Sequence, residues 1–317
     1  MVYFYKDFHS FSPFFSAIDT QSYLRNSYQK LAVEYADQKS YENCYPFIYY
    51  LEHAQIYYKQ AADSPLLIQP ILLFYGFVHL IKACLLTTDP CYPENTSVLA
   101  HGVSTRKRKK RQYEFLKDEV KFQKNGLFPC MLENMFNIKH LEGDKATMNE
   151  LLQHIPELNS LFLQLEGKKT FVEICNQQQS FSFPKQMMDH FHMTENRFIE
   201  FIEMKSSSTL SFKESTTNGL LFDGFNKGNG VKPLKYNLEE GHFCFPLLKG
   251  ELFTFPEIIF HYLLLYNLSM IARYETEWWS ELIKTMPNKD YPFIVQFLNI
   301  TSRKGPFLAY QYLMGKR

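Results

Sequence analysis

Apolar residues in the first third of the chain recur at three- and four-residue steps, which is the period of a helix with one buried face. One such repeat lies between Thr20 and Asp37, and a second follows from Ser40, a candidate N-cap, to Tyr58. A third helix is expected from the start signal Ser64–Pro65, with Pro70 as either a kink or the true first turn. The first third is therefore predicted to be helical.

The third predicted helix is apolar all round, which is typical of a helix in the middle of a bundle. Residues 64–81 carry no charge, but they contain two prolines, a glutamine and a histidine. A second apolar segment, 258–272, is short for a membrane span and holds His261, Asn267 and Ser269. Buried core helices explain both segments better than membrane spans, so we expect no membrane association.

The period changes to that of strands after residue 168. Segments 198–205, 210–213, 220–222 and 242–245 are predicted strands joined by Ser- and Gly-rich turns. Further helices are predicted at 146–154, 157–165, 256–273, 276–286, 290–300 and 305–314. The expected fold is mainly α with a small antiparallel β insert (α+β): a helical region 1–165, a β-containing insert 166–250, and C-terminal helices 251–317 that pack back on the bundle.

Charge and cysteine usage exclude several classes of protein. The net charge of +1 means that the whole molecule is no electrostatic nucleic-acid binder, so such a role would need a local patch. The six cysteines are scattered without a C-x-x-C pair, which argues against a zinc ribbon, a redox motif or a disulfide framework. No basic-then-apolar leader opens the sequence, so a cytoplasmic location is expected.

Two landmarks resemble known families. Residues 73–86 (LFYGFVHLIKACLL), with His101-Gly102 downstream, resemble the core of the HEPN superfamily of helical domains. The whole chain resembles the YaaC-like family of Firmicutes, in which residues 262–274 followed by Trp278 form the other landmark. The resemblance implies a HEPN-like helical bundle. It also implies a pathway, because genes of this kind tend to lie beside the gene for IMP dehydrogenase.

Many HEPN proteins are ribonucleases that use an arginine followed, after four to six intervening residues, by a histidine at a dimer interface. None of the eight arginines in this chain has a histidine at that spacing. The reversed order occurs in His101 with Arg106 and in His192 with Arg197, but it is not the family's motif. This departure favours binding or regulation over cleavage.

The third helix supplies the first candidate ligand-binding residues. Tyr75, His79 and Lys82 lie at steps of four and three, so they share one helix face. A histidine beside a lysine can hold a phosphate or move a proton. The alternative is a core histidine with a satisfied hydrogen bond, while the lysine reaches the surface.

His101-Gly102 precedes a run of six cations, Arg106 to Arg111. Glycine lets a backbone amide approach an anion closely, and the cations would attract phosphate. A solvated charge run is the alternative, and the absence of aromatic residues within the run speaks against base stacking there.

The helix predicted at 256–273 carries a polar stripe of Tyr262, Tyr266, Ser269 and Arg273. Buried polar groups need partners, so this stripe either reads a phosphate or carboxylate, or forms an interhelical network or dimer seam. His190 and His192 would share one face of a strand, but no third metal ligand stands at a recognisable spacing. No metal site and no catalytic residue are therefore assigned.

We expect a non-catalytic cytoplasmic regulatory or binding protein without a cofactor. Its partner would be another protein, with IMP dehydrogenase as the candidate that the resemblance implies, a second copy of itself, or a nucleotide. One alternative is a degenerate HEPN ribonuclease or phosphate-transferring enzyme centred on His79 or His101. The other is an RNA-binding adaptor that acts through residues 106–111.

Overall fold

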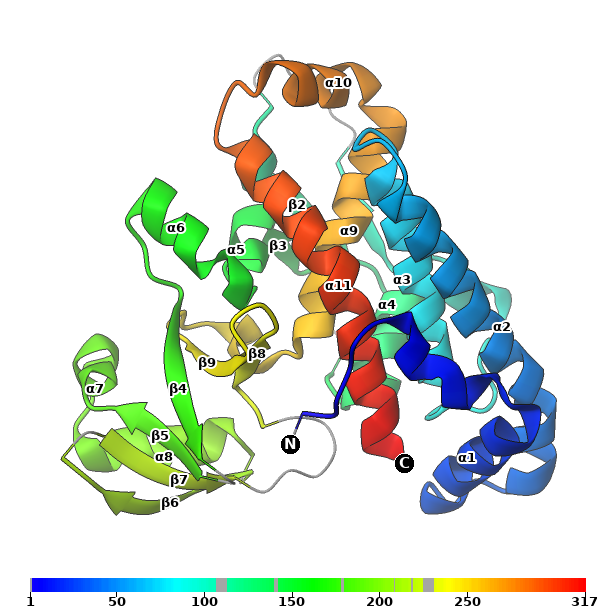
Figure 1. Cartoon of the computed structure of the whole chain (residues 1–317), viewed down its shortest axis with the longest axis horizontal. Coiled ribbons are helices and arrows are strands. Elements are labelled where there is room, and N and C mark those ends of the chain that lie inside the picture. Colours follow the sequence, from blue (N-terminus) through cyan, green and yellow to red (C-terminus); the bar gives the residue numbers. More distant parts are fainter. Residues whose placement is uncertain are drawn as a thin grey trace. The chain divides into compact units, whose positions relative to one another are not determined.

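The computed structural model describes residues 2–106, 113–139, 142–177, 180–207, 209–217, 219–224 and 231–317. These residues are mostly helical, with antiparallel sheets in the middle of the chain, which confirms the predicted mainly α, α+β class. The chain divides into two compact units (Figure 1). A helical unit comprises Phe4–Leu152 and Phe260–Arg317, and a sheet unit comprises Gln153–Ile259 with Met1–Tyr3.

Long helices build the helical unit. They are α1 (Ala17–Lys30), α2 (Ala36–Ala62), α3 (Gln69–Leu86), α9 (Glu257–Tyr274, whose first turn belongs to the sheet unit), α10 (Thr276–Thr285) and α11 (Asp290–Lys316). Shorter pieces are η1 (Phe8–Phe15), η2 (Thr96–Leu99), η3 (Phe115–Lys117), α4 (Leu127–Cys130), η4 (Met131–Met135) and α5 (Met148–Leu152). A three-stranded antiparallel sheet adds β1 (Val103–Thr105), β2 (Glu119–Phe122) and β3 (Lys145–Thr147).

The sheet unit is built on one six-stranded antiparallel sheet with strand order β6-β7-β5-β4-β9-β8. Its strands are β4 (Phe171–Gln177), β5 (Ser180–Pro184), β6 (Leu210–Ser215), β7 (Gly219–Gly224), β8 (Lys235–Asn237) and β9 (His242–Pro246). Its helices are η5 (Pro156–Leu158), α6 (Asn159–Glu166), α7 (Gln186–Phe191), α8 (Glu195–Lys205) and η6 (Glu251–Thr254). Phenylalanines such as Phe183, Phe222 and Phe245 pack against one another to form its core.

The apolar helix α3 is the centre of the helical unit. It packs against α2 and against α11, which is red in Figure 1. By length and composition alone α3 could cross a membrane, and 67% of that stretch is buried inside the protein. Burial against neighbouring helices is what a core helix of a bundle shows. Of the two alternatives for Pro70, the structure gives the true start, because α3 begins at Gln69.

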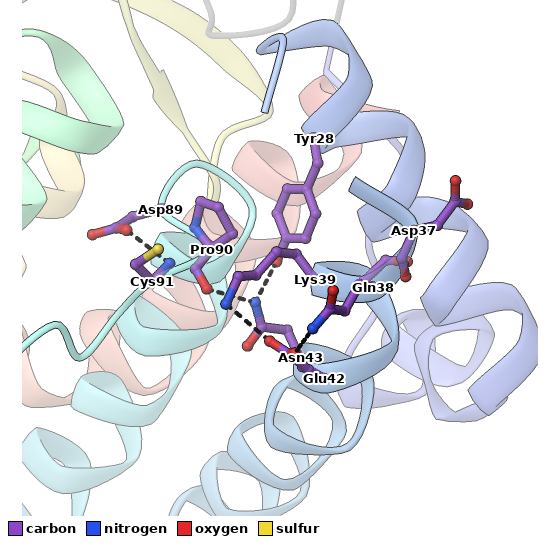
Figure 2. Close-up of polar contacts among 10 residues, drawn as sticks. Tyr28, Asp37, Gln38, Lys39, Glu42, Asn43, Asp89, Pro90 and Cys91 are labelled. Carbon is purple, nitrogen blue, oxygen red and sulfur yellow. Dashed lines mark hydrogen bonds and ion pairs between the residues drawn. The ribbon is translucent and has the colours of Figure 1, made fainter. Parts of the chain in front are cut away.

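Asn43 joins three parts of the helical unit through its side-chain amide (Figure 2). Its Nδ2 donates to the Tyr28 hydroxyl on α1 at 3.0 Å and to the carbonyl of Pro90, in the loop after α3, at 2.9 Å. The Tyr28 hydroxyl in turn donates to the carbonyl of Leu86 at 2.8 Å. These bonds hold the end of α3 against α1 and α2.

Several element predictions are wrong, among them the helix start at Ser64–Pro65, because α3 begins at Gln69, and the helical repeat from Thr20 to Asp37, because α1 ends at Lys30. Residues 198–205 form helix α8 rather than a strand, because Phe198 and Ile202, one helical turn apart, are the fully buried pair. Ser40 is no cap: α2 begins at Ala36, and Ser40 is buried inside it. The helices predicted at 290–300 and 305–314 are one helix, α11, which continues through Pro306.

Candidate functional site

His79 on α3 lies among aromatic side chains of α2. Its ring is stacked on Tyr57, with 5.6 Å between ring centroids and 21° between planes, and it lies 5.1 Å from His53 and 5.9 Å from Tyr50. The Nδ1 atom of His79 is buried and has no hydrogen-bond partner in the described part of the chain. This differs from a core histidine with satisfied hydrogen bonds. One ring nitrogen of His79 is therefore a buried polar atom that the described residues leave unsatisfied.

Lys82 lies one turn further along the same face of α3. Its Nζ atom is 5.6 Å from the centroid of the Tyr50 ring, a cation–π contact. Burial lowers the pKa of Lys82 from its usual value. Among the described residues no carboxylate forms an ion pair with this lysine. The predicted shared face of Tyr75, His79 and Lys82 is thus present and turned toward α2.

The loop between η2 and β1 delivers His101 to the same place. The His101 ring contacts Phe74, Tyr75 and Tyr266, with centroid distances of 5.0, 6.2 and 5.6 Å. Tyr262, fully buried on α9, donates its hydroxyl to the backbone carbonyl of His101 at 2.8 Å. Tyr262 therefore holds the loop from the buried side and does not line an open surface.

Gly102 fixes the loop at its next residue. Its φ of +76° is left-handed, and a Cβ there would lie 2.5 Å from Cδ of Pro129 and 2.9 Å from the backbone nitrogen of Phe128. The carbonyl of Gly102 accepts a hydrogen bond from the backbone N–H of Gln123 at 3.0 Å. Close packing thus accounts for glycine at this position.

Arg273 completes the group from the last turn of α9. Its Nη1 donates to the Tyr75 hydroxyl at 3.2 Å, and its Nε donates to the carbonyl of Ser269 at 3.1 Å. The Ser269 hydroxyl donates to the carbonyl of Tyr266 at 2.8 Å. The polar stripe predicted on this helix therefore has partners, and it aims the guanidinium at α3.

We name Tyr75, His79, Lys82, His101 and Arg273 the cationic cluster. The pKa of His79 is lowered to about 4 by burial, by Lys82 and by His53. The pKa of His101 is lowered by burial, by Arg273 and by Lys82. Every charge that perturbs these imidazoles is positive, and within the described ranges Arg273, like Lys82, has no ion pair. Half-buried positive charges without a carboxylate favour a bound anion.

Other predicted site residues lie apart from this cluster or outside the described residues. Arg106 is exposed just after β1, and residues 107–111 of the basic run lie outside the described residues. The reversed pair His192 and Arg197 lines an open pocket of about 380 Å³ in the sheet unit. His190 lies in α7 and His192 caps it, so the two do not share a strand face. The described residues contain no group of three or more potential metal ligands.

Sequence reasoning missed the contribution of α2. Tyr50, His53 and Tyr57 stand at steps of three and four, the spacing of one helix face, and all three contact His79. The apolar repeat of the same helix hides this second pattern, because both patterns have the same helical period.

A protein-family model described as YaaC-like Protein matches residues 12–313. No curated protein and no solved structure matches the chain. The match includes both landmark segments, the α3 core with His101-Gly102 and the end of α9. Because the model covers far more than half of the sequence, the chain belongs to the family of YaaC-like proteins.

Proposed function

We propose that this protein is a non-catalytic binding protein that recognises a phosphate-bearing ligand, a nucleotide, at the cationic cluster. One observation supports this most directly. The half-buried cations Lys82 and Arg273 both lower the pKa of His101, and no described carboxylate pairs with either cation. Buried charge of one sign is unfavourable until an opposite charge arrives. A phosphate dianion would provide that charge.

Each member of the cluster has a role in this proposal. The guanidinium of Arg273 can hold two phosphate oxygens at once, and Lys82 supplies a compact second charge. The Tyr75 hydroxyl, already held by Arg273, can donate to the same anion. The faces of Tyr50 and Tyr57 offer a base a surface to stack on.

Isothermal titration calorimetry with IMP, inosine and inorganic phosphate tests the proposal. We expect IMP to bind, inosine to bind at least about tenfold more weakly, and Arg273→Ala or Lys82→Ala to weaken IMP by about tenfold or more. Lys59→Ala, which removes an exposed lysine of α2, is the matched control and should bind as the unmodified protein does. Equal affinity for IMP and inosine would contradict the proposal.

Regulation through a protein partner is the second part of the proposal. A HEPN-like helical core, a cytoplasmic site of action and IMP dehydrogenase as partner all derive from the family resemblance. Co-purification of the two proteins, with and without IMP, tests the partner. Failure to associate at micromolar concentrations in either condition would remove IMP dehydrogenase and leave the nucleotide proposal standing.

A degenerate ribonuclease or phosphate-transferring enzyme is the second candidate, and one observation favours it. Arg273 bonds the Tyr75 hydroxyl, the Tyr75 ring contacts that of His101, and Arg273 lowers the pKa of His101, so an arginine and a histidine that the linear motif lacks lie near one another. A neutral imidazole near an arginine is suited to general-base work on a phosphodiester. Cleavage of labelled RNA that disappears in His101→Ala would overturn the non-catalytic proposal.

The RNA-binding adaptor acting through residues 106–111 stays a prediction, because residues 107–111 lie outside the described residues. It predicts RNA affinity that falls steeply with salt and that is lost when the six cations are neutralised.

A further inference from the structure

A row of aromatic side chains crosses the exposed face of α2. Five aromatic residues stand at steps of four, and we name them the aromatic row: Tyr41, Tyr45, Tyr49, His53 and Tyr57. Tyr41, Tyr45 and Tyr49 are 69%, 54% and 53% exposed, His53 is exposed, and Tyr57 is half-buried. These rings are not part of the buried face of α2. That face is formed by a different set of residues: Ser40, Cys44, Phe47, Leu51, Ala54, Tyr58 and Ala61.

The row follows the four-residue spacing of a helix, and Pro46 lies inside α2 between Tyr45 and Tyr49. Four residues of α-helix rise about 6 Å, and the rings of Tyr45 and Tyr49 are 6.0 Å apart between centroids. Rows at this spacing run diagonally across a helix, so the aromatic row drifts from the solvent side toward α3. It therefore offers two neighbouring exposed rings, Tyr45 and Tyr49, on the way toward α3.

The row ends in the cationic cluster. The Tyr57 ring is stacked on His79 and on Tyr75, and the His53 ring lies 5.1 Å from that of His79. Lys82 lies over the ring of Tyr50, and Arg273 lies over the ring of Tyr75. The inner end of the aromatic row is thus in contact with the cationic cluster.

Exposed aromatic rings beside a cationic site match the chemistry of unpaired bases and backbone phosphates. A protein partner would also need carboxylates at the cluster and would use the aliphatic residue of this face, Ile56, which is 53% exposed. None of the five positions of the row is aliphatic. Beside the row, the carboxylate of Glu42 pairs with Lys39 at 2.9 Å, whereas Glu52 is exposed and has no ion pair among the described residues.

We propose that single-stranded RNA lies along α2, with bases stacked on the aromatic row and one phosphate in the cationic cluster. The proposal rests on the phosphate-binding function given above, which it extends from a nucleotide to a polymer. RNA rather than DNA is the ligand, because the exposed hydroxyls of Tyr41, Tyr45 and Tyr49 can bond a ribose 2′-hydroxyl.

Fluorescence anisotropy with a labelled RNA of about 12 nucleotides tests it. The double variant Tyr45→Ala, Tyr49→Ala should weaken binding by roughly 20-fold or more, since base–aromatic stacking is worth about fivefold to 100-fold for each base. Both positions are exposed and alanine is the best helix former, so the helix is retained, which circular dichroism checks. Ile56→Ala, equal in exposure to Tyr49, is the matched control and should leave affinity unchanged.

The probes separate the alternatives. Duplex RNA should bind much more weakly, because its bases are not free to stack, and single-stranded DNA should bind less tightly than RNA. The double variant Tyr45→Phe, Tyr49→Phe should keep most of the affinity and lose the preference for RNA. DNA and RNA binding equally to the unmodified protein would overturn the RNA assignment.

Titration of IMP into the same variants distinguishes failure of this inference from failure of the proposed function. Unchanged IMP and RNA affinity in Tyr45→Ala, Tyr49→Ala would overturn the inference and leave the nucleotide site intact. Loss of both IMP and RNA binding in Arg273→Ala alone supports both. If the tyrosine variant instead changes only the oligomeric state in sedimentation velocity, the row is a contact between copies of this chain and the inference is wrong.

Discussion

Arg273 and Tyr75, 198 positions apart in the sequence, are joined by a hydrogen bond of 3.2 Å from the guanidinium to the phenol oxygen. The same guanidinium lies over the Tyr75 ring, 5.8 Å from its centroid. Because Arg273 also bonds the carbonyl of Ser269 on its own helix, its orientation is fixed from two sides. The arginine is therefore set in place before any ligand arrives.

This preorganisation predicts separate outcomes for Tyr75→Phe and Arg273→Lys. Removing the hydroxyl should weaken IMP binding by about fivefold while changing the free energy of unfolding by less than about 1.5 kcal/mol. Arg273→Lys keeps the charge but loses the planar fork, so binding should weaken by about tenfold or more. Tyr274→Phe, beside the same guanidinium, is the control and should bind normally. Calorimetry that shows no effect of Arg273→Lys would contradict the bidentate role.

His79 should titrate far below an ordinary histidine. Its pKa of about 4 is lowered by burial first and then by Lys82 and His53, so a proton-detected titration of its ring should show a midpoint near that value. Since the folded pKa lies below the unfolded value, His79 stabilises the fold fully above about pH 6.5, and this contribution is lost as pH falls toward the folded pKa. A midpoint of about 6.5 would show that the ring is neither buried nor beside a cation.

Binding of an anion whose own charge is constant should become tighter as the pH falls. A bound anion raises the pKa of His79 and of His101, so binding takes up protons. Affinity for a sulfate ion, whose own charge is constant, should therefore rise between about pH 7 and about pH 5. His101→Gln should reduce this slope. A pH-independent affinity would place the anion away from both imidazoles.

Asn43→Ala should destabilise the helical unit. The change leaves the carbonyl of Pro90 without its donor and removes the bond to Tyr28, at a cost of about 1–3 kcal/mol in the free energy of unfolding (Figure 2). Gln38→Ala, which removes an exposed hydrogen bond to Glu42, is the control and should cost less than about 0.5 kcal/mol. Urea denaturation measures both. Equal values would mean that the amide of Asn43 bonds water as well as it bonds Pro90.

Gly102→Ala should be far more harmful than Gly143→Ala. Both glycines have positive φ, +76° and +87°, but a Cβ at Gly102 would meet Pro129 and Phe128, whereas one at Gly143 would meet nothing within 4 Å. Gly143→Ala should cost about 1–2 kcal/mol from the backbone alone, and Gly102→Ala should add overpacking of about 1–3 kcal/mol. Thermal unfolding followed by circular dichroism compares the two. Equal losses would show that the loop carrying His101 yields without strain.

The sequence predicts the helices around the site well, because α3 and α9 are apolar helices with clear polar positions. The shared face of Tyr75, His79 and Lys82 follows from spacing alone. Their meeting with His101 and Arg273 does not, since it depends on how the loop after α3 and the end of α9 pack. No local sequence pattern shows that residues so far apart in the chain lie close together in the fold.

The errors have local causes. Apolar and polar residues alternate enough in 198–205 to resemble a strand. The burial of Phe198 and Ile202, one helical turn apart, is what fits a helix instead. The strands β1 and β3 have three residues each, too few for an alternating pattern to be visible. Gly305-Pro306 looks like a helix break, yet α11 continues through Pro306. Gly305 lets α11 approach Tyr58 of α2 closely, since a Cβ there would lie 2.5 Å from the Tyr58 hydroxyl.

Helix α9 is shared by the two units. Its first turn, Glu257–Ile259, belongs to the sheet unit, and its last turn carries Arg273 in the helical unit. An uninterrupted helix of this length is a stiff rod of about 27 Å, since each residue rises about 1.5 Å. Arg273 is therefore carried by a rigid backbone segment rather than by a loop, so its position in the cationic cluster is set by a whole helix.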